Sequence, residues 1–358
     1  MDSTRVKKRI LSYDIIRILA ISMVVMIHVT SPYLKNFEGG SFNFLWGVIC
    51  NGLSRSAVPL FVMLSGALML NEDRIIDASK MKKSIMSVLT LLVSWSLIYA
   101  SIYKVGLPLL RGDSVSLSGF IRAFLLGHYH LWFLYMILGL YLITPILRLF
   151  VKRKNSKFIT YFCVLSLVFQ FSIPLTNFLL EEFVGIGGLF EDFLGKFRMG
   201  FVSPFITYYL LGWYISNVPI KKSHRKVIYG LGLLSLIVTI AGVIAYTPEI
   251  ANAYEIFYRN ESVNILLTST AIFIGLYYVL KDKVIGSDTC AHVIQKASEM
   301  SFGVYAIHVL VLLLLDAFGL RSMPGFCIPL IWLVTILISY AITWMASKIP
   351  YINKLFKC

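Results

Sequence analysis

The sequence contains recurring apolar stretches, each long enough to cross the hydrocarbon core of a bilayer, and this pattern restricts the fold to a membrane protein. A transmembrane helix needs about 20 predominantly apolar residues. Hydrophobic residues make up 58% of the chain and charged residues only 14%, unlike a soluble globular protein. The expected spans lie at 13–33, 44–70, 84–103, 130–150, 158–179, 200–217, 227–247, 263–280, 301–319 and 326–347. The sequence therefore predicts an all-α polytopic membrane helical bundle with about ten transmembrane helices.

Basic residues are divided unequally between the two sets of connections that alternate along these spans. One set carries 23 Lys or Arg and the other carries 8. Because cytoplasmic loops carry the excess of Lys and Arg, both termini are expected in the cytoplasm. We expect a basic cytoplasmic N-terminus (1–12), one transmembrane domain (13–350) and a cytoplasmic tail (351–358). The positive charges follow the topology, so we expect the bilayer, and no nucleic acid, as a partner.

The first span carries three polar side chains, Asp14, Arg17 and His28. A charged group in hydrocarbon costs at least a few kcal/mol and generally survives only when it is paired or faces a wet cavity. On a helix, Asp14 and Arg17 lie about 60° apart, and Arg17 and His28 about 20° apart but about 16 Å apart along the axis. All three therefore share one face, which we expect to line a polar cavity. Snorkelling with an Asp14 salt bridge is the alternative for Arg17, and simple packing is the alternative for His28.

The second span carries Arg55 about eleven residues from its start, followed by Pro59. An Arg at that depth is expected to need an anionic partner or ligand. Ser65 is a further candidate for substrate binding, although the Ser65-Gly66 pair is also typical of ordinary helix packing in membranes.

Five other polar or aromatic side chains are candidates for substrate binding. His130 and Trp132 open the fourth span, where an interfacial aromatic belt is the alternative. His308 lies deep in the ninth span, where an interhelical hydrogen bond would also explain it. Lys82 and Lys83 start the third span, and an ordinary cytoplasmic charge signal is their alternative.

The sequence lacks the common signatures of metal and nucleotide chemistry. It contains no CxxC pair, no HExxH motif and no Gly-rich phosphate loop after a strand, so we expect no metal site. No external pair of cysteines is available for a disulfide among Cys50, Cys163, Cys290, Cys327 and Cys358.

Five segments in order resemble the acyltransferase-3 family of bacterial integral-membrane acyltransferases, which transfer acyl groups to cell-surface sugars. The family's Arg-x10-His pattern is matched by Arg17 and His28 in SYDIIRILAISMVVMIH. The other segments are RSAVPLFVMLSGALML, HLWFLYMILGLYLITPILR, LLGWYIS and SFGVYAIH. The resemblance covers the chain from Asp14 to Pro350.

The resemblance implies an O-acyltransferase of the bacterial inner membrane, with His28 as catalytic base and Arg17, partnered by Asp14, lining the donor path. It also implies acyl-CoA, acetyl-CoA first of all, as the donor substrate rather than a bound cofactor. The acceptor would be a hydroxyl of an envelope polysaccharide or lipid-linked sugar. Direct transfer and an acyl-histidine intermediate are both compatible with these residues. A homo-oligomer is compatible as well.

Two features depart from the family pattern. Many members carry an Arg-rich pattern after the second helix, where this chain has Arg74, Lys80, Lys82 and Lys83. Some members add an external hydrolase-like domain, and this chain stops at Cys358.

Two other classes of function remain open from the residues alone. Intramembrane Asp, Arg and His also mark proton-coupled secondary transporters, which often contain internal repeats. No convincing repeat is present in this sequence, which favours the enzyme. A sensory or assembly protein that keeps the fold without catalysis is the third possibility.

Overall fold

The computed structural model describes residues 10–74, 76–246, 256–283 and 287–356. The predicted basic N-terminus is therefore described only at residues 10–12, and the predicted tail only to residue 356. The described chain is helical and contains no strand. Its α-helices are α1 (Leu11–Asn36), α2 (Phe42–Ser54), α3 (Ala57–Met69), α4 (Ala78–Ser101), α5 (Leu107–Arg111), α6 (Leu117–Leu126), α7 (Trp132–Phe150), α8 (Ser156–Ser166), α9 (Ile173–Val184), α10 (Leu189–Gly195), α11 (Pro204–Asn217), α12 (Lys222–Tyr246), α14 (Val263–Leu280), α15 (Asp288–Ala317) and α16 (Ile328–Ser347).

Nine helical stretches of the described chain are long and apolar enough to cross a membrane, which confirms the predicted all-α polytopic bundle. They are Leu11–Asn36, Phe42–Met69, Ala78–Arg111, Leu117–Phe150, Arg153–Val184, Lys222–Tyr246, Val263–Leu280, Asp288–Ala317 and Gly325–Ser347. The remaining expected span, 200–217, forms α11, whose 14 residues are fewer than a straight crossing needs.

Helix α11 packs very closely along α3. A Cβ atom added at Gly66 would collide with the backbone of Tyr209, and one added at Gly212 would collide with the backbone of Met63. Only glycine permits this approach, as is common where helices pack in membranes. Gly66 therefore serves helix packing, as the alternative reading of the Ser65-Gly66 pair expected.

The second span is broken into α2 and α3 at Arg55 and Ser56. Pro59 explains the break, because a proline has no N–H to donate to the carbonyl four residues earlier and its ring clashes with that carbonyl. Proline is tolerated within the first turn of the new helix, where N–H groups have no helical acceptor. The break leaves Arg55 at the junction, part way along the span.

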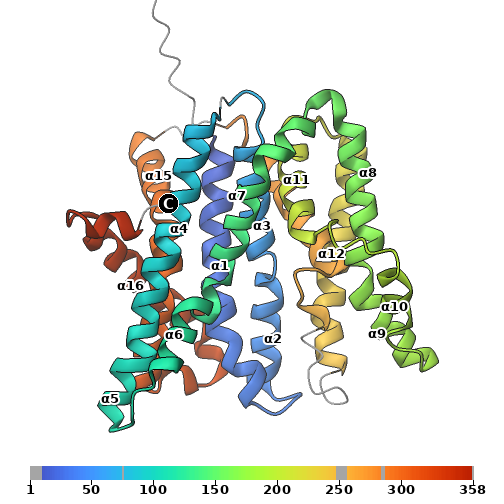
Figure 1. Cartoon of the computed structure of the whole chain (residues 1–358). Helices are drawn as coiled ribbons and strands as arrows, with labels where there is room; N and C mark the ends of the chain where they lie inside the picture. Colours follow the sequence, from blue (N-terminus) through green and yellow to red (C-terminus); the bar gives the residue numbers. More distant parts are fainter. Residues whose placement is uncertain (1–9, 75, 247–255, 284–286, 357–358) are drawn as a thin grey trace, which may run out of the picture.

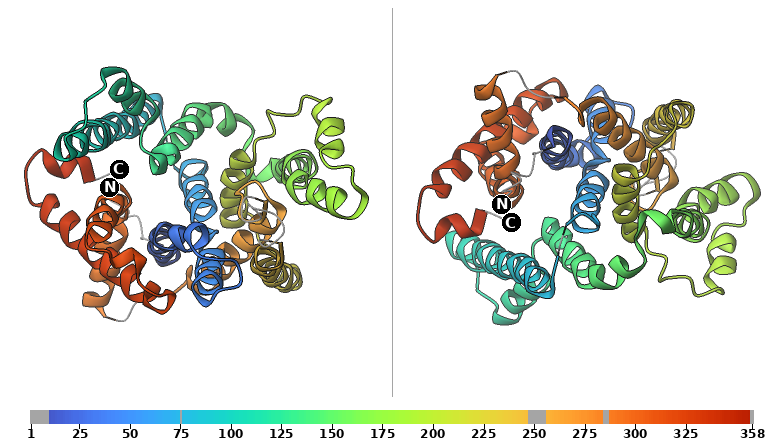
Figure 2. Two further views of the ribbon diagram at one scale, coloured as in Figure 1. Left: turned by 90° about the horizontal axis from the view of Figure 1, so that it is seen from below. Right: turned by 90° about the horizontal axis from the view of Figure 1, so that it is seen from above.

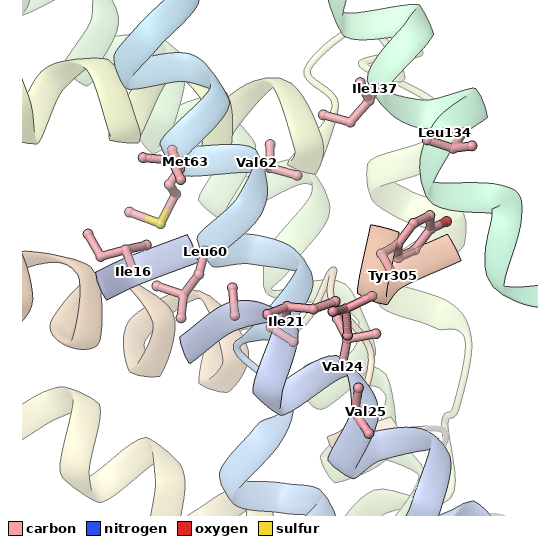
Figure 3. Packing of buried hydrophobic residues seen from close by; sticks show 14 of the residues in the cluster. Ile16, Ile21, Val24, Val25, Leu60, Val62, Met63, Leu134, Ile137 and Tyr305 are labelled. Carbon is pink, nitrogen blue, oxygen red and sulfur yellow. The ribbon is translucent and has the colours of Figure 1, made fainter. Parts of the chain in front are cut away.

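Helix α1 lies inside the bundle and contacts α2, α3, α14, α15 and α16 (Figure 2). Its apolar face belongs to the main core, which Ile16, Ile21, Val24 and Val25 of α1 share with Leu60 of α3 and Tyr305 of α15 (Figure 3). Helices α8, α9 and α10 instead lie at one side of the bundle (Figures 1 and 2). The first span thus packs against helices from the beginning and the end of the chain.

The alternating connections give a direct test of sidedness. Cysteine probes placed near Lys154 and Lys222 should be shielded from membrane-impermeant reagents in intact cells, because the charge asymmetry predicts that these connections lie in the cytoplasm. A probe near Glu182 should be labelled, whereas the corresponding position at Glu255 lies outside the described residues. Labelling of the Lys154 and Lys222 probes in cells shown to be sealed would overturn the topology.

Candidate active site

The carbonyl group of His28 is left without its usual helical partner. Pro32, four residues later in α1, has no N–H to donate to it. Arg321, in the connection between α15 and α16, supplies the bond instead, with Nη2 2.8 Å from the His28 oxygen. The Arg321 Nη1 atom lies 2.7 Å from a carboxylate oxygen of Asp316. The α15–α16 connection is therefore attached to α1 at His28.

Four histidines from three parts of the chain form a cluster, which we call the histidine cluster: His28, His128, His130 and His308. The ring centres of His28 and His308 are 5.1 Å apart, and those of His130 and His308 are 5.5 Å apart. The Nδ1 atoms of His128 and His130 are 3.1 Å apart. The three site histidines expected from the sequence, His28, His130 and His308, therefore meet in space.

The hydrogen bonds of His308 fix its proton. Its Nδ1 atom lies 2.7 Å from the Tyr305 carbonyl oxygen, which can only accept, so Nδ1 carries the hydrogen in the neutral ring. The Nε2 atom is then the basic nitrogen, and it is buried without a partner among the described residues. The interhelical bond that the sequence offered as an alternative is replaced by a bond within α15.

Two buried tyrosines hold the histidine cluster in place. The Tyr305 hydroxyl donates to the His130 carbonyl over 2.7 Å, and the Tyr99 hydroxyl donates to the Ala306 carbonyl over 2.8 Å. The Tyr99 ring also stacks on His128, with centres 4.7 Å apart. These bonds join α4, α15 and the turn before α7, so the imidazoles are positioned by several helices.

A pocket of about 520 Å³ opens beside His28, within the usual size range of small-molecule sites. Its lining comes from α1, α2 and the turns that precede α7 and α14. The lining residues are Ile27, His28, Ser31, Leu34, Lys35, Asn51, Arg55, Tyr129, Tyr258 and Arg259. We call this cavity the His28 pocket.

Arg55 reaches the His28 pocket from the break in the second span. Its Nε atom donates to the Asn51 side-chain oxygen over 2.6 Å, and its guanidinium carbon lies 4.3 Å from the centre of the Tyr258 ring. Among the described residues, no carboxylate pairs with Arg55. An amide and an aromatic face therefore hold the cation and leave its charge available to a ligand.

Tyr258 is itself fixed. Its hydroxyl donates to the Val48 carbonyl over 2.8 Å. Burial raises the pKa of Tyr258 well above its usual value, against the opposing effect of the Arg55 charge. The phenol therefore keeps its proton and supports Arg55 as a neutral ring.

Arg17 and Asp14 lie elsewhere on α1. The Arg17 Nη1 atom donates to the Ser298 hydroxyl over 2.9 Å and lies 3.8 Å from an Asp14 carboxylate oxygen. Eleven residues of helix, about 16 Å, separate Arg17 from His28, and neither Arg17 nor Asp14 lines the His28 pocket. The salt bridge with Asp14 that the alternative reading of Arg17 included is present, and of the three polar residues of α1 only His28 lines the His28 pocket.

The other predicted site residues lie outside the His28 pocket. Ser65 is half-buried on α3, and Trp132 is exposed against Phe205, with ring centres 5.7 Å apart. Lys82 and Lys83 are exposed near the start of α4. Of the predicted residues, His28 and Arg55 line the His28 pocket, and His130 and His308 lie against the His28 ring without lining the pocket, whereas these four residues lie elsewhere.

The sequence analysis did not single out several residues of the candidate site, although a local sequence pattern points to some of them. Asn51 lies four residues before Arg55 on the same helix face, a spacing at which side chains meet. Pro32 indicates that the His28 carbonyl has no helical N–H partner and needs a hydrogen-bond donor from another part of the chain. Tyr258 and Arg321 come from connections distant in sequence, where no local pattern indicates their contact.

The bond from Arg321 to the His28 carbonyl should matter for catalysis. Arg321→Gln removes a charge-assisted hydrogen bond, so we expect acyl transfer to fall about tenfold, the equivalent of about 1.4 kcal/mol. Pro32→Ala restores a helical N–H to that carbonyl, so Arg321→Gln should cost less in the Pro32→Ala protein. Rates of the two single variants and the double variant measure this coupling. Strict additivity of the two changes would contradict the arrangement.

A family model described as an acyltransferase domain, that of the acyltransferase-3 family, matches residues 10–347. No curated protein matches the chain, and no solved structure does. The family match covers the segments that carry His28, Arg55, His130 and His308. With a match over nearly its whole length, this chain belongs to the acyltransferase-3 family and is a multi-pass membrane acyltransferase.

Proposed function

We propose that this protein is an O-acyltransferase of the bacterial inner membrane. It moves an acyl group, acetyl in the simplest case, from cytosolic acyl-CoA to a hydroxyl of an envelope polysaccharide or a lipid-linked sugar. The observation that carries the proposal is the placement of His28 beside a pocket that also holds the Arg55 cation. Family membership supports acyl transfer over a proton-coupled transporter.

His28 is proposed as the base. An imidazole titrates near neutral pH and can take the proton of the acceptor hydroxyl as its oxygen attacks the thioester carbonyl. The C–O bond forms, the tetrahedral oxyanion collapses, and the C–S bond breaks to release the coenzyme A thiolate, which takes up a proton. An acyl-histidine intermediate would use the same residue as a nucleophile.

Arg55 is proposed to stabilise the oxyanion. Its planar guanidinium is held by Asn51 and Tyr258, so it is positioned before the reaction begins. Fixed positive charge in a site partly closed to water stabilises developing negative charge more than water does. Arg55 thereby gains the anionic ligand that an Arg at this depth was expected to need.

Arg17 is proposed to lie along the donor path. The donor is anionic and made in the cytosol, and the cytoplasmic connections are the basic ones. A coenzyme arm entering near Arg17 would have to reach about 16 Å along α1 to bring its thioester to His28. This arrangement gives Asp14 the role of a partner that orients Arg17.

The test uses purified protein in detergent with labelled acetyl-CoA and candidate acceptor sugars. Release of free coenzyme A that depends on the acceptor, together with labelled sugar, supports the enzyme. Acetyl-CoA left intact with every acceptor offered, by protein that is folded and binds the donor, would contradict the proposed donor. Uptake of solute by proteoliposomes without any chemistry would favour a transporter.

A further inference from the structure

The His28 pocket carries more positive charge than acyl transfer itself requires. Lys35, Arg55 and Arg259 line it, and no Asp or Glu of the described chain does so. Among the described residues, the acid that pairs with Arg259 is Glu261, with a nitrogen-oxygen distance of 3.9 Å at side chains that are 59% and 34% exposed. Such an exposed, loose pair neutralises little charge.

Topology does not explain these cations. Lys35 and Arg259 belong to the connections predicted to be external, which hold only 8 of the 33 Lys and Arg residues. External loops are depleted in Lys and Arg by the positive-inside rule. Two of those eight residues nevertheless line one pocket, so a ligand of this pocket is a better explanation of their position than orientation in the membrane.

The chemistry accounts for only one of the three cations. Transfer from a neutral thioester to a neutral hydroxyl develops one transient negative charge, on the oxyanion, and Arg55 is placed for it. Lys35 lies seven residues after His28 on α1, two turns farther along nearly the same face and about 10 Å away. A sugar ring that offers its hydroxyl to His28 would therefore extend toward Lys35.

We propose that the acceptor carries an anionic group, a carboxylate or a phosphate, which Lys35 and Arg259 bind while the sugar hydroxyl faces His28. This inference rests on the proposed function for the identity of the ligand, whereas the anion preference of the pocket is a property of the pocket itself. The positive charges of Lys35 and Arg259 would also attract an anionic acceptor to the pocket from a distance.

The first experiment measures the charge preference without any acceptor. Ser31, which lines the pocket, is replaced in Ser31→Cys, and its reaction with an anionic and a cationic methanethiosulfonate of similar size is followed by peptide mass spectrometry. The native cysteines provide the background in the parent protein. We expect the anionic reagent to react about tenfold faster, because the clustered positive charges of the pocket attract anions and raise their local concentration. Lys35→Gln with Arg259→Gln should reduce that ratio severalfold.

Lys196→Gln is the matched control, because Lys196 is an exposed cation of another external connection and lies outside the pocket. It should leave the ratio unchanged. Equal rates for the two reagents, or a ratio that the double variant does not alter, would overturn the proposal.

The second experiment identifies the source of the anion. In nanodiscs of neutral lipid, methyl glucuronide or glucose 6-phosphate should protect Ser31→Cys from the neutral reagent methyl methanethiosulfonate better than methyl glucoside does. Protection by the first sugar identifies a carboxylate and by the second a phosphate. Equal protection by the neutral glycoside contradicts the proposal. Protection by phosphatidylglycerol nanodiscs alone would assign the site to a lipid headgroup and overturn the acceptor assignment.

These experiments and the transfer assay give different results when the proposed function is wrong and when this inference is wrong. If no thioester is consumed while the charge ratio and its dependence on Lys35 and Arg259 persist, the pocket binds anions but the proposed reaction is wrong. If sugars are acylated without preference for an anionic acceptor, the reaction stands and this inference is wrong.

Discussion

His28→Ala is expected to lower acyl transfer by about two to four orders of magnitude, the usual contribution of a general base or acid. The imidazole proposed to take the hydroxyl proton would be lost, while Arg17 and the donor path proposed beside it stay intact. Acyl-CoA should therefore still bind with nearly unchanged affinity. Transfer rates at saturating donor, combined with a direct binding measurement for acyl-CoA, separate the two effects.

Asp14 and the other histidines provide the controls for His28. Asp14→Asn should be milder than His28→Ala, because Asp14 is proposed to act only through Arg17. Arg17→Ala should weaken donor binding. Substantial transfer by a His28→Ala protein free of wild-type enzyme would remove His28 from the base role. The search would then move to His130 and His308, whose buried Nε2 atoms have no partner among the described residues.

Arg55→Leu is expected to reduce transfer about a hundredfold, because removing a charged hydrogen-bonding partner from a largely desolvated site generally costs about 2–5 kcal/mol. Arg55→Lys keeps the charge but loses the planar group that meets both Asn51 and the Tyr258 ring. We expect it to lose about tenfold. Transfer rates and thermal unfolding of both variants should be measured together, so that a loss of folding is recognised.

Arg122→Leu serves as the matched control for Arg55, since Arg122 is exposed on α6 and lies outside the His28 pocket. It should transfer acyl groups at the normal rate. If both Arg55 variants also do so, Arg55 is a packing residue and the oxyanion must be stabilised by another donor.

The spans could be predicted because each is specified locally. A helix satisfies its own backbone hydrogen bonds in lipid, so a run of apolar residues is enough to identify it. Two short helices, α11 and α6, depart from the predicted set of spans. Helix α11 has 14 residues and depends on close packing at Gly66 and Gly212, and α6 has ten residues with Leu117, Leu125 and Leu126 exposed.

The candidate site could be predicted only residue by residue. His28, His130 and His308 each attract notice as polar groups in apolar surroundings, but their approach depends on how α1, α15 and the turn before α7 pack. Arg17 and His28 show the opposite outcome. They share a helix face, but eleven positions along the helix keep them far apart. The contact of Arg55 with Tyr258 crosses 203 residues of sequence, so helical periodicity cannot indicate it.

The position of α1 inside the bundle has a consequence for biogenesis. Ser298, the hydrogen-bond partner of Arg17, follows it by 281 residues, so at ordinary translation rates roughly 15–60 s pass between the two. During that delay α1 must reside in the bilayer or the insertion machinery without α15 and α16. The Asp14–Arg17 pair lies within one turn of α1 and needs no later helix. The pair can therefore partly neutralise the two charges of the newly synthesised α1 until α15 and α16 have been inserted.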